Sequence, residues 1–406
     1  MRRLLVLGAG PAQLGLLEAA RARGDLHLVV ADRDPSAPGF ALADERAVIS
    51  SEDEEALGRL ARAREIHGVV SPGGDWPVGI AARIAERLGL PHPIDAATGA
   101  VVTSKPRQRE RFAAAGVPHA RELELGSREP GVGPMPAAAT EVALPCVVKA
   151  ADRQGQRGLT LVREEAALAG ALRRAAAESR TGAVLVEEFV DGPEVTVIAV
   201  GVDGSFVPLA VTDRLTAEPP AFGVALAHAW PASADVSAAV DAARAAAAAV
   251  GIRHGPSYTQ LRLSADGPRV MEVAARLGGG HDADLVEAAT GVDLNGLAVS
   301  FALGEPCDDQ LQGRVGAVEA GGACVVFLVA PEGVLRAVEG VVEAEALAGV
   351  RRAWLYRRPG WRFGPLRRGA DRAGAILAVG DSRDDALARG RRAAESVRFR
   401  VDADAP

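Results

Sequence analysis

Acidic and turn-forming residues separate two apolar segments near the middle of the chain. Residues 184–186 and 195–200 are rich in β-branched side chains and predict strands, and Asp191-Gly192-Pro193 between them is typical of a turn. Such a segment could present backbone N–H and C=O groups to the edge of a purine, while Glu194 accepts a hydrogen bond from a ribose hydroxyl. An ordinary edge hairpin with exposed acids is the alternative that these residues alone leave open.

A lysine at the end of an apolar segment is the second candidate. Residues 145–149 predict a strand that ends at Lys149, and the polar turn that follows, residues 150–158, contains Gly155 and Gly158. A lysine in such a strand either points to solvent or meets an anion. Because the backbone N–H groups of a glycine-rich turn can surround phosphate oxygens, the combination favours an anion.

Polar side chains also occur in a predicted hairpin further along the chain. Residues 257–263 and 269–273 predict two antiparallel strands, and residues 264–268 between them are typical of a hairpin turn. In this pairing Gln260 and Glu272 lie side by side across the two strands. The hairpin therefore brings an amide and a carboxylate to one place.

In their order and spacing these features resemble the ATP-grasp ligases, which join a carboxylate to a nucleophile, usually an amine, through an acyl phosphate. Residues 187–194 (EEFVDGPE) resemble the adenine hinge and the ribose-binding glutamate of that family. Residues 271–280 (MEVAARLGGG) resemble its closing motif, and Lys105 before a predicted helix resembles its α-phosphate lysine. The resemblance covers essentially the whole chain.

The resemblance implies a role for each matched residue. Arg276 would stabilise the transferred phosphoryl group or the acyl phosphate, and Glu272 and Gln260 would face Mg²⁺. His228, Gly278 and Gly279 would contact the substrate. ATP would be bound by the lysines, the glycine turn and the hinge: Lys105, Lys149, Gly155, Gln156, Gly158, Glu187, Phe189, Val190 and Glu194.

Three positions depart from the family pattern. Gln260 stands where the first metal glutamate is usual, Ala274 where many members have asparagine, and Gln156 where serine often follows the first loop glycine. Magnesium prefers charged oxygen ligands, so the loss of a carboxylate weakens the site, although phosphates and waters can supply other ligands. Backbone binding by the glycine turn does not depend on the serine.

The N-terminal segment must position part of this site. Residues 4–7 and 28–32 predict strands, with the glycine-containing turn 8–15 and a helix between them. This start resembles a dinucleotide-binding fingerprint, but Gln13 occupies the third glycine position, where the motif requires close contact between helix and strand. The same segment resembles the Rossmann-like N-terminal domain of ATP-grasp ligases, which binds no dinucleotide.

The predicted fold combines α/β and α+β parts. We expect a Rossmann-like domain over residues 1–97, an ATP-grasp core over 98–305 with a lid subdomain at about 120–190, and a small α+β lobe over 306–406. Residues 72–77 follow a predicted parallel strand and form either a substrate-facing loop or a plain turn. A loop is expected at 124–141 and a short strand at 341–343.

Composition limits the class of protein. The hydrophobic fraction of 48% with 24% charged residues is typical of a soluble globular protein, and a net charge of −7 argues against general nucleic-acid binding. No segment has the length of a membrane span, and we expect Arg107, Arg109 and Arg111 on solvated helix faces. Three cysteines far apart suggest neither disulfides nor zinc, which fits a reducing cytoplasm. A homodimer is an arrangement that the sequence leaves open.

The resemblance implies an ATP-dependent carboxylate–amine ligase. Its substrates would be a small-molecule carboxylate and an amine, with an amino acid among them, and its products an amide or peptide bond, ADP and phosphate. Two alternatives stay open: an ATP-grasp enzyme of purine or carboxylase type that uses formate or bicarbonate, and a nucleotide-binding protein with impaired catalysis. Gln260 and Ala274 motivate the last of these.

Overall fold

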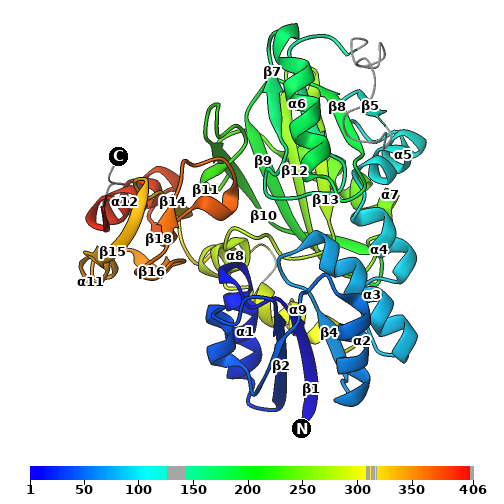
Figure 1. Cartoon of the computed structure of the whole chain (residues 1–406), viewed down its shortest axis with the longest axis vertical. Helices are drawn as coiled ribbons and strands as arrows, with labels where there is room; N and C mark the ends of the chain where they lie inside the picture. Colours follow the sequence, from blue (N-terminus) through cyan, green and yellow to red (C-terminus); the bar gives the residue numbers. More distant parts are fainter. Residues whose placement is uncertain (126–141, 308–310, 312–315, 317, 403–406) are drawn as a thin grey trace.

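The computed structural model of the protein describes residues 1–125, 142–307, 311, 316 and 318–402. A parallel sheet lies at the N-terminal end, in the strand order β3-β2-β1-β4, with helices packed against it (Figure 1). Its central strands are apolar on both faces, as expected for a sheet covered on both sides. Its elements are β1 (Arg2–Leu7), η1 (Pro11–Gln13), α1 (Leu14–Ala22), β2 (Leu26–Asp32), η2 (Pro38–Leu42), β3 (Glu45–Val48), α2 (Glu54–Ala63), β4 (Gly68–Val70) and α3 (Asp75–Leu88).

The acid at the end of β2 holds the first turn of the chain. One carboxylate oxygen of Asp32 accepts a hydrogen bond from the backbone N–H of Ala9 at 2.7 Å, and the other accepts one from Asp34 at 2.9 Å. The Gln13 side chain packs against Gly8, where an added Cβ would lie 3.1 Å from it. Asp32 therefore has local partners, and Gln13 fills space that a dinucleotide fingerprint leaves open.

Two helices lead from this sheet into a smaller antiparallel sheet with the strand order β5-β8-β6-β7. Helix α6 packs on β6 through an apolar cluster that includes Ala171 and Val148. Most of the loop expected at 124–141 lies outside the described residues. The elements of this part are α4 (Ala96–Val102), α5 (Lys105–Ala115), β5 (Glu122–Leu125), β6 (Cys146–Ala150), β7 (Thr160–Val162), α6 (Glu165–Glu178) and β8 (Val184–Glu188).

An eight-stranded sheet occupies the centre of the molecule, in the order β13-β12-β9-β10-β11-β14-β18-β16 (Figure 1). Three of its strands belong to the C-terminal quarter of the chain, so the sheet crosses the predicted boundary at residue 306. The division into domains stays a prediction. The strands and their helices are β9 (Glu194–Val202), β10 (Ser205–Thr216), β11 (Ala225–Trp230), α7 (Ser237–Val250), β12 (Gly255–Ser264), β13 (Gly267–Ala274), α8 (Asp282–Thr290), α9 (Leu294–Ala302), β14 (Gly322–Leu328), β16 (Val350–Leu355) and β18 (Gly374–Gly380).

The C-terminal region adds a three-stranded sheet, β17-β15-β19, beside the end of the central one. The strand predicted at 341–343 is wrong, because these residues begin helix α11. Two valines suggest a strand, but Gly340 turns the chain with a φ of +80° and the alternating Glu and Ala residues that follow favour a helix, which buries Ala344. The elements are β15 (Gly333–Glu339), α11 (Val341–Glu345), β17 (Arg362–Phe363), η4 (Gly369–Asp371), α12 (Arg383–Ser396) and β19 (Arg398–Asp402).

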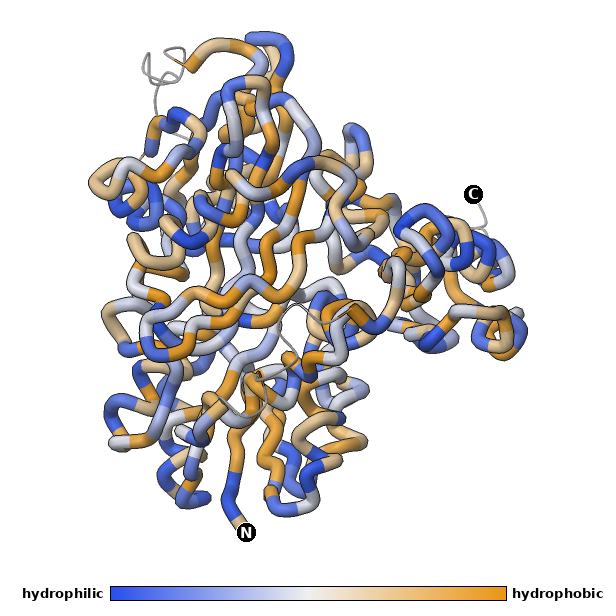
Figure 2. The backbone as a smooth tube through the Cα atoms, turned by 180° about the vertical axis from the view of Figure 1, so that it is seen from behind, coloured by the Kyte–Doolittle hydropathy of each residue, from blue (hydrophilic) through white to orange (hydrophobic). Residues whose placement is uncertain are grey.

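None of the helices in the described ranges combines the length and the apolar character that a membrane-crossing helix needs. Hydrophobic segments follow the strands of the sheets, and hydrophilic segments lie toward the outside (Figure 2). All three cysteines are buried: Cys146, Cys307 and Cys324.

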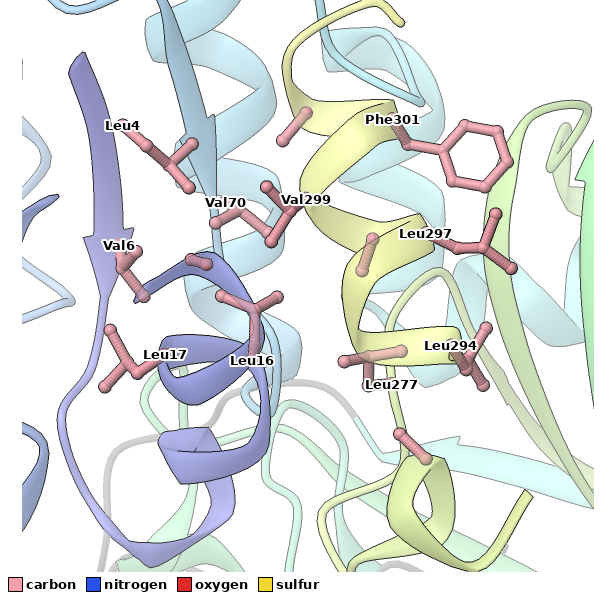
Figure 3. Packing of buried hydrophobic residues seen from close by; sticks show 14 of the residues in the cluster. Leu4, Val6, Leu16, Leu17, Val70, Leu277, Leu294, Leu297, Val299 and Phe301 are labelled. Atoms are coloured by element: carbon pink, nitrogen blue, oxygen red, sulfur yellow. The ribbon is translucent and has the colours of Figure 1, made fainter. Parts of the chain in front are cut away.

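A large buried cluster connects the N-terminal sheet to the helix that follows the closing motif. Val70 of β4 lies next to Val299 of α9, and Leu16 of α1 points toward the same helix, whereas Leu297 projects from the opposite side of α9 (Figure 3). Leu277 belongs to the same cluster. Burying these side chains is the main stabilising contribution to the contact. The closing motif is therefore anchored directly to the N-terminal sheet.

Gly68 marks the closest approach in this contact. A Cβ added at Gly68 would lie 2.4 Å from the backbone oxygen of Ala302, at the end of α9. A Cβ at Gly58, in the middle of α2, would meet nothing nearer than Arg87 at 3.6 Å. The two glycines therefore form a matched pair for testing the contact.

We expect Gly68→Ala to destabilise the fold by about 1–3 kcal/mol, because either β4 or α9 must move to admit the methyl group. Gly58→Ala should instead stabilise it by about 0.5–1 kcal/mol, since alanine is the better helix former. Denaturant unfolding of the two variants measures both changes. Equal shifts in the same direction would contradict the contact between β4 and α9.

Candidate active site

A cavity of about 500 Å³ lies where the N-terminal sheet, the glycine turn and the β12–β13 hairpin meet. A smaller cavity of about 110 Å³ adjoins it beneath the hinge. Lys105, Gln156 and Glu272 line both, so the two form one continuous site. The residues predicted from three separate parts of the chain are therefore brought together.

Lys149 is held by a buried carboxylate at the inner end of the smaller cavity. Its Nζ lies 2.5 Å from Oε2 of Glu187, while Oε1 of Glu187 accepts hydrogen bonds from the Nε and Nη2 of Arg109 at 3.0 and 2.6 Å. Arg109 also donates to the backbone oxygen of Met271 at 2.6 Å. The prediction that Arg109 lies on a solvated helix face is wrong: it is 1% exposed, because α5 presents it to the carboxylate of β8.

Burial and the neighbouring charges have opposite effects on the pKa values of Glu187 and Lys149. Burial would raise the pKa of Glu187, but the charges of Arg109 and Lys149 outweigh it and hold that pKa at about 2. Burial lowers the pKa of Lys149 to about 8, although Glu187 favours its charged form. Glu187, predicted to contact ATP, thus contributes its side chain mainly to fixing the lysine.

The glycine turn has the backbone geometry expected of an anion-binding loop. Gly155, Gln156 and Gly158 all have positive φ angles, of +68°, +63° and +69°. Gly155 and Gln156 line both cavities. Gly158 packs inward, and a Cβ there would lie 3.1 Å from Cα of Ala175 in α6, so its role is to let the turn lie against that helix.

The hinge residues line the smaller cavity. Phe189 and Val190 are among them, and the Phe189 ring lies 6.2 Å from that of Phe222. Arg262 stacks over the Phe189 ring at 5.3 Å. Glu194 also lines this cavity, where its Oε1 accepts a hydrogen bond from Arg214 at 2.6 Å.

The predicted hairpin register is confirmed, since Gln260 pairs directly with Glu272 across β12 and β13. Oε1 of Glu272 lies 3.5 Å from the Nζ of Lys105, which also donates to the backbone oxygen of Arg153 at 2.6 Å. The amide of Gln260 donates to the hydroxyl of Tyr258 at 3.1 Å. One carboxylate and one amide therefore face the cavity next to a lysine.

Arg276 lies between the closing motif and the N-terminal sheet. Its Nε donates to Oδ1 of Asp75 at 2.5 Å, and its Nη1 donates to the backbone oxygen of Leu277 at 2.7 Å. Burial raises the pKa of Asp75, but Arg276 and Lys105 outweigh burial and hold it below its usual range. Asp75 lies within the segment 72–77 predicted as a loop or turn, of which residues 75–77 instead form the start of α3. That loop therefore reaches the site.

His228 forms a buried pair with Asp282, in which Nδ1 lies 2.7 Å from Oδ1. The second oxygen of Asp282 accepts a hydrogen bond from the backbone N–H of Gly280 at 3.1 Å. Gly279 lines the larger cavity with His228. Gly278 does not appear in the cavity lining; a Cβ there would lie 2.1 Å from Asp282, so its small size admits that carboxylate.

Sequence reasoning did not assign roles to four residues that the structure places in these pairs: Asp75, Arg109, Arg214 and Asp282. A signal existed for Arg214, because it is a charged residue within a predominantly apolar strand, as Lys149 is. Asp282 lies two residues after the glycine run of the closing motif. For Arg109 no local signal exists, since its partner lies 78 residues further along the chain.

Replacing Glu187 by glutamine should destabilise the protein by about 3–5 kcal/mol, because Arg109 and Lys149 would keep their charges without a buried counter-ion. Glu188→Gln is the matched control, since its partner Arg121 is 84% exposed and such pairs contribute about 1 kcal/mol or less. Thermal or denaturant unfolding at neutral pH measures both. Similar losses in the two variants would contradict a special role for the buried group.

The same pair of variants predicts a pH dependence. Because the pKa of Glu187 is lowered from 4.5 to about 2, its stabilising effect is complete above pH 4.5 and disappears as the pH falls toward 2. The difference in stability between the wild type and Glu187→Gln should therefore shrink over that interval. Unfolding measured at pH 7 and pH 3 decides this; a constant difference would be inconsistent with the lowered pKa.

Comparison with known proteins is consistent with this geometry. The family model for the carbamoyl-phosphate synthase L chain, ATP binding domain, matches residues 109–310. The model for the L-amino acid ligase C-terminal domain 2 matches residues 326–402. Together the two models cover the glycine turn, the hinge, the closing motif and most of the C-terminal region.

Curated relatives extend over nearly the whole chain. An uncharacterized protein of Sinorhizobium fredii, y4rH, is 30% identical over 99% of this chain and 84% of its own length. Carnosine synthase 1 of Gallus gallus is 32% identical over 87% of this chain, which spans only 40% of that longer protein. A formate-dependent phosphoribosylglycinamide formyltransferase of Burkholderia vietnamiensis is 29% identical, with 98% and 95% covered.

Solved structures show the same fold. The L-amino acid ligase from Bacillus licheniformis superposes with a TM-score of 0.82 at 21% identity, covering 99% of both chains. The biotin carboxylase domain of the Hydrogenobacter thermophilus 2-oxoglutarate carboxylase, in complex with MgADP, ADP and bicarbonate, has a TM-score of 0.78 at 18% identity over 98% of this chain and 91% of that one. The predicted resemblance and mixed α/β fold are confirmed: the chain belongs to the ATP-grasp superfamily, among its ligases that form carbon–nitrogen bonds.

Proposed function

We propose that this protein uses ATP to join the carboxylate of one small molecule to the amine of another, with an amino acid among the substrates, through an acyl phosphate. The observation that carries the proposal is one continuous cavity. It runs from the hinge past Lys149 and the glycine turn to Glu272, Arg276 and His228. Such an arrangement has a place for a nucleotide at one end and for a second molecule at the other.

The smaller cavity fits a nucleoside triphosphate. Phe189, Phe222 and Val190 offer apolar contacts suited to a purine, and Glu194 offers a carboxylate suited to a ribose hydroxyl. Lys149 and the turn around Gly155 supply positive charge and backbone N–H groups suited to phosphates. Glu194 would exchange or share its present partner, Arg214, when a ribose is bound.

The residues beside the phosphate end fit magnesium bound mainly as MgATP. Glu272 supplies a carboxylate and Gln260 an amide oxygen, both hard oxygen donors. The described residues contain no cluster of three or more acidic, histidine or cysteine ligands, as expected where phosphates and water complete the coordination. When bound, magnesium would neutralise phosphate charge during transfer.

The chemistry then depends on positioning and electrostatics. The substrate carboxylate attacks the γ-phosphorus, the bond to the β-phosphate oxygen breaks, and the acyl phosphate that results is attacked by the amine with release of phosphate. Arg276, which bonds to Asp75 in the free protein, would stabilise the acyl phosphate, and Lys105 and Lys149 would offset phosphate charge. Little covalent help from the protein is needed in such transfers.

Two observations support an amino acid as substrate. The C-terminal region matches a domain of L-amino acid ligases, and carnosine synthase is among the relatives. The formyltransferase relative supports the competing proposal, in which formate is the acid. The two differ in what must be added to the enzyme for ATP to be consumed.

The wild-type enzyme should release ADP and phosphate only when both an acid and an amine are present. We expect turnover with at least one pair in a panel of amino acids, and none with formate and glycinamide ribonucleotide. Arg276→Gln should lower kcat by at least about 100-fold, because a preorganised charge at the reacting group typically contributes 10²–10³-fold. If formate is the one acid that supports turnover, the competing proposal is favoured.

Magnesium titration tests whether Glu272 and Gln260 are the metal pair. Gln260→Glu should lower the free magnesium needed for half-maximal activity, because a second carboxylate would face the metal beside Glu272. Glu272→Gln should abolish turnover while the protein stays folded. If the first change leaves the magnesium dependence unaltered and the second variant stays active, Glu272 and Gln260 are not the metal pair.

A further inference from the structure

Asp75 is a buried carboxylate that the N-terminal domain contributes to the larger cavity. It is the first residue of α3, after β4 and the short loop that follows that strand. Its side chain is 11% exposed, and its Oδ1 accepts a hydrogen bond from the Nε of Arg276 at 2.5 Å. Both residues line the larger cavity, and neither lines the smaller one beneath the hinge. The pair therefore lies on the side of the site that is open to the second molecule.

Helix capping does not account for an acid at this position. An acidic residue in the first turn of a helix often accepts hydrogen bonds from the free backbone N–H groups there. In α3 the N-cap residue is Gly74, which has no side chain, and the backbone N–H of Asp75 is bound by the side-chain oxygen of Gln154 from the glycine turn. The carboxylate of Asp75 bonds instead to Arg276, which belongs to the closing motif.

Asp75 also differs from the other acids of this cavity. Four other carboxylates of the described residues line it: Asp32, Glu52, Asp152 and Glu272. The two aspartates hold turns of the chain by accepting hydrogen bonds from backbone N–H groups, and the first glutamate pairs with Arg180. The second glutamate is the metal ligand that we propose. The partner of Asp75, in contrast, is Arg276, which the proposed reaction draws to the acyl phosphate.

The charges at the reacting end are balanced in the free protein. Asp75 pairs with Arg276, and Oε1 of Glu272 lies 3.5 Å from the Nζ of Lys105. In the proposed reaction magnesium and the phosphates of ATP engage Glu272 and Lys105, and the acyl phosphate engages Arg276. Asp75 would then be a buried anion that has lost its cation, which is strongly unfavourable. Formation of the acyl phosphate therefore favours the arrival of another cation beside Asp75.

The amine substrate is such a cation. An aliphatic amine is largely protonated at neutral pH, and its nitrogen must approach the carbonyl carbon of the acyl phosphate, next to Arg276. A carboxylate beside that arginine can accept charge-assisted hydrogen bonds from the ammonium group. The exchange of Arg276 for an ammonium group would keep Asp75 paired, and it would admit the amine after the acid has been activated.

We propose that Asp75 binds the ammonium group of the amine substrate once Arg276 has turned to the acyl phosphate. Asp75 then selects amines that carry a positive charge at neutral pH, and it holds their nitrogen beside the activated carboxyl group. This inference rests on the proposed ligase function and deepens it by assigning a binding residue for the second substrate.

Hydroxylamine provides the test, because it is mostly uncharged at pH 8 and attacks an acyl phosphate without an ammonium group. With one fixed acid and ATP, hydroxylamine gives a hydroxamate and phosphate, whereas an amino acid as the amine gives an amide and phosphate. Asp75→Asn should raise the KM for the amino acid by about 10- to 100-fold, as expected for loss of a charge-assisted contact, while the KM values for hydroxylamine and ATP change less than about threefold.

Two further variants control the result. Glu55→Gln removes an exposed carboxylate from the first turn of α2, another helix of the N-terminal domain, and should leave all three KM values unaltered. Asp75→Glu keeps the carboxylate on a longer side chain and should show the same selectivity with a smaller loss. It provides the test if Asp75→Asn does not fold, which denaturant unfolding of each variant determines.

A merely structural role for Asp75 would give a different pattern. If it only orients Arg276, Asp75→Asn would slow formation of the acyl phosphate, so that kcat with hydroxylamine and kcat with the amino acid would fall together. That result, or an unchanged KM for the amino acid, would overturn the ammonium site while the ligase function stands. If the wild type forms neither amide nor hydroxamate with any acid, the ligase proposal fails and the inference falls with it.

Discussion

The site depends on one buried carboxylate. Glu187 is fully buried between Arg109 and Lys149, and through Arg109 it is connected to the backbone of Met271 in the closing hairpin. Burying three charges is costly, and only their mutual neutralisation makes it tolerable. The same group therefore fixes the relative positions of α5, the smaller sheet and the hairpin, and directs a lysine into the cavity.

The other positively charged side chains of the cavity that are discussed above also have acidic partners. Arg276, Arg214 and Lys105 each lie near an acid contributed by another element, so they are held in place before any substrate binds. Such pairs are a form of preorganisation, because the cations need only exchange one anion for another.

Sequence reasoning succeeded where the signal is local. The alternation of apolar and polar residues with a short turn determines the register that pairs Gln260 with Glu272, and a lysine in an apolar strand beside two glycines indicates an anion. It failed where a distant partner decides the outcome. Arg109 has neighbours on α5 that suggest solvent, and only the folded chain brings Glu187 to it.

The glutamine at position 260 is consistent with the charges around it. Glu272 has Lys105 at 3.5 Å as its counter-ion, and the Gln260 amide is satisfied by Tyr258. A second carboxylate at position 260 would face Glu272 across the strands, where like charges destabilise a sheet. Arg276 and Asp75 also lie close to Glu272 but pair with each other, so a further carboxylate would add negative charge without a partner of its own. Glutamine at position 260 therefore favours the stability of the empty site, and in the ligase we propose magnesium would be brought chiefly by the nucleotide.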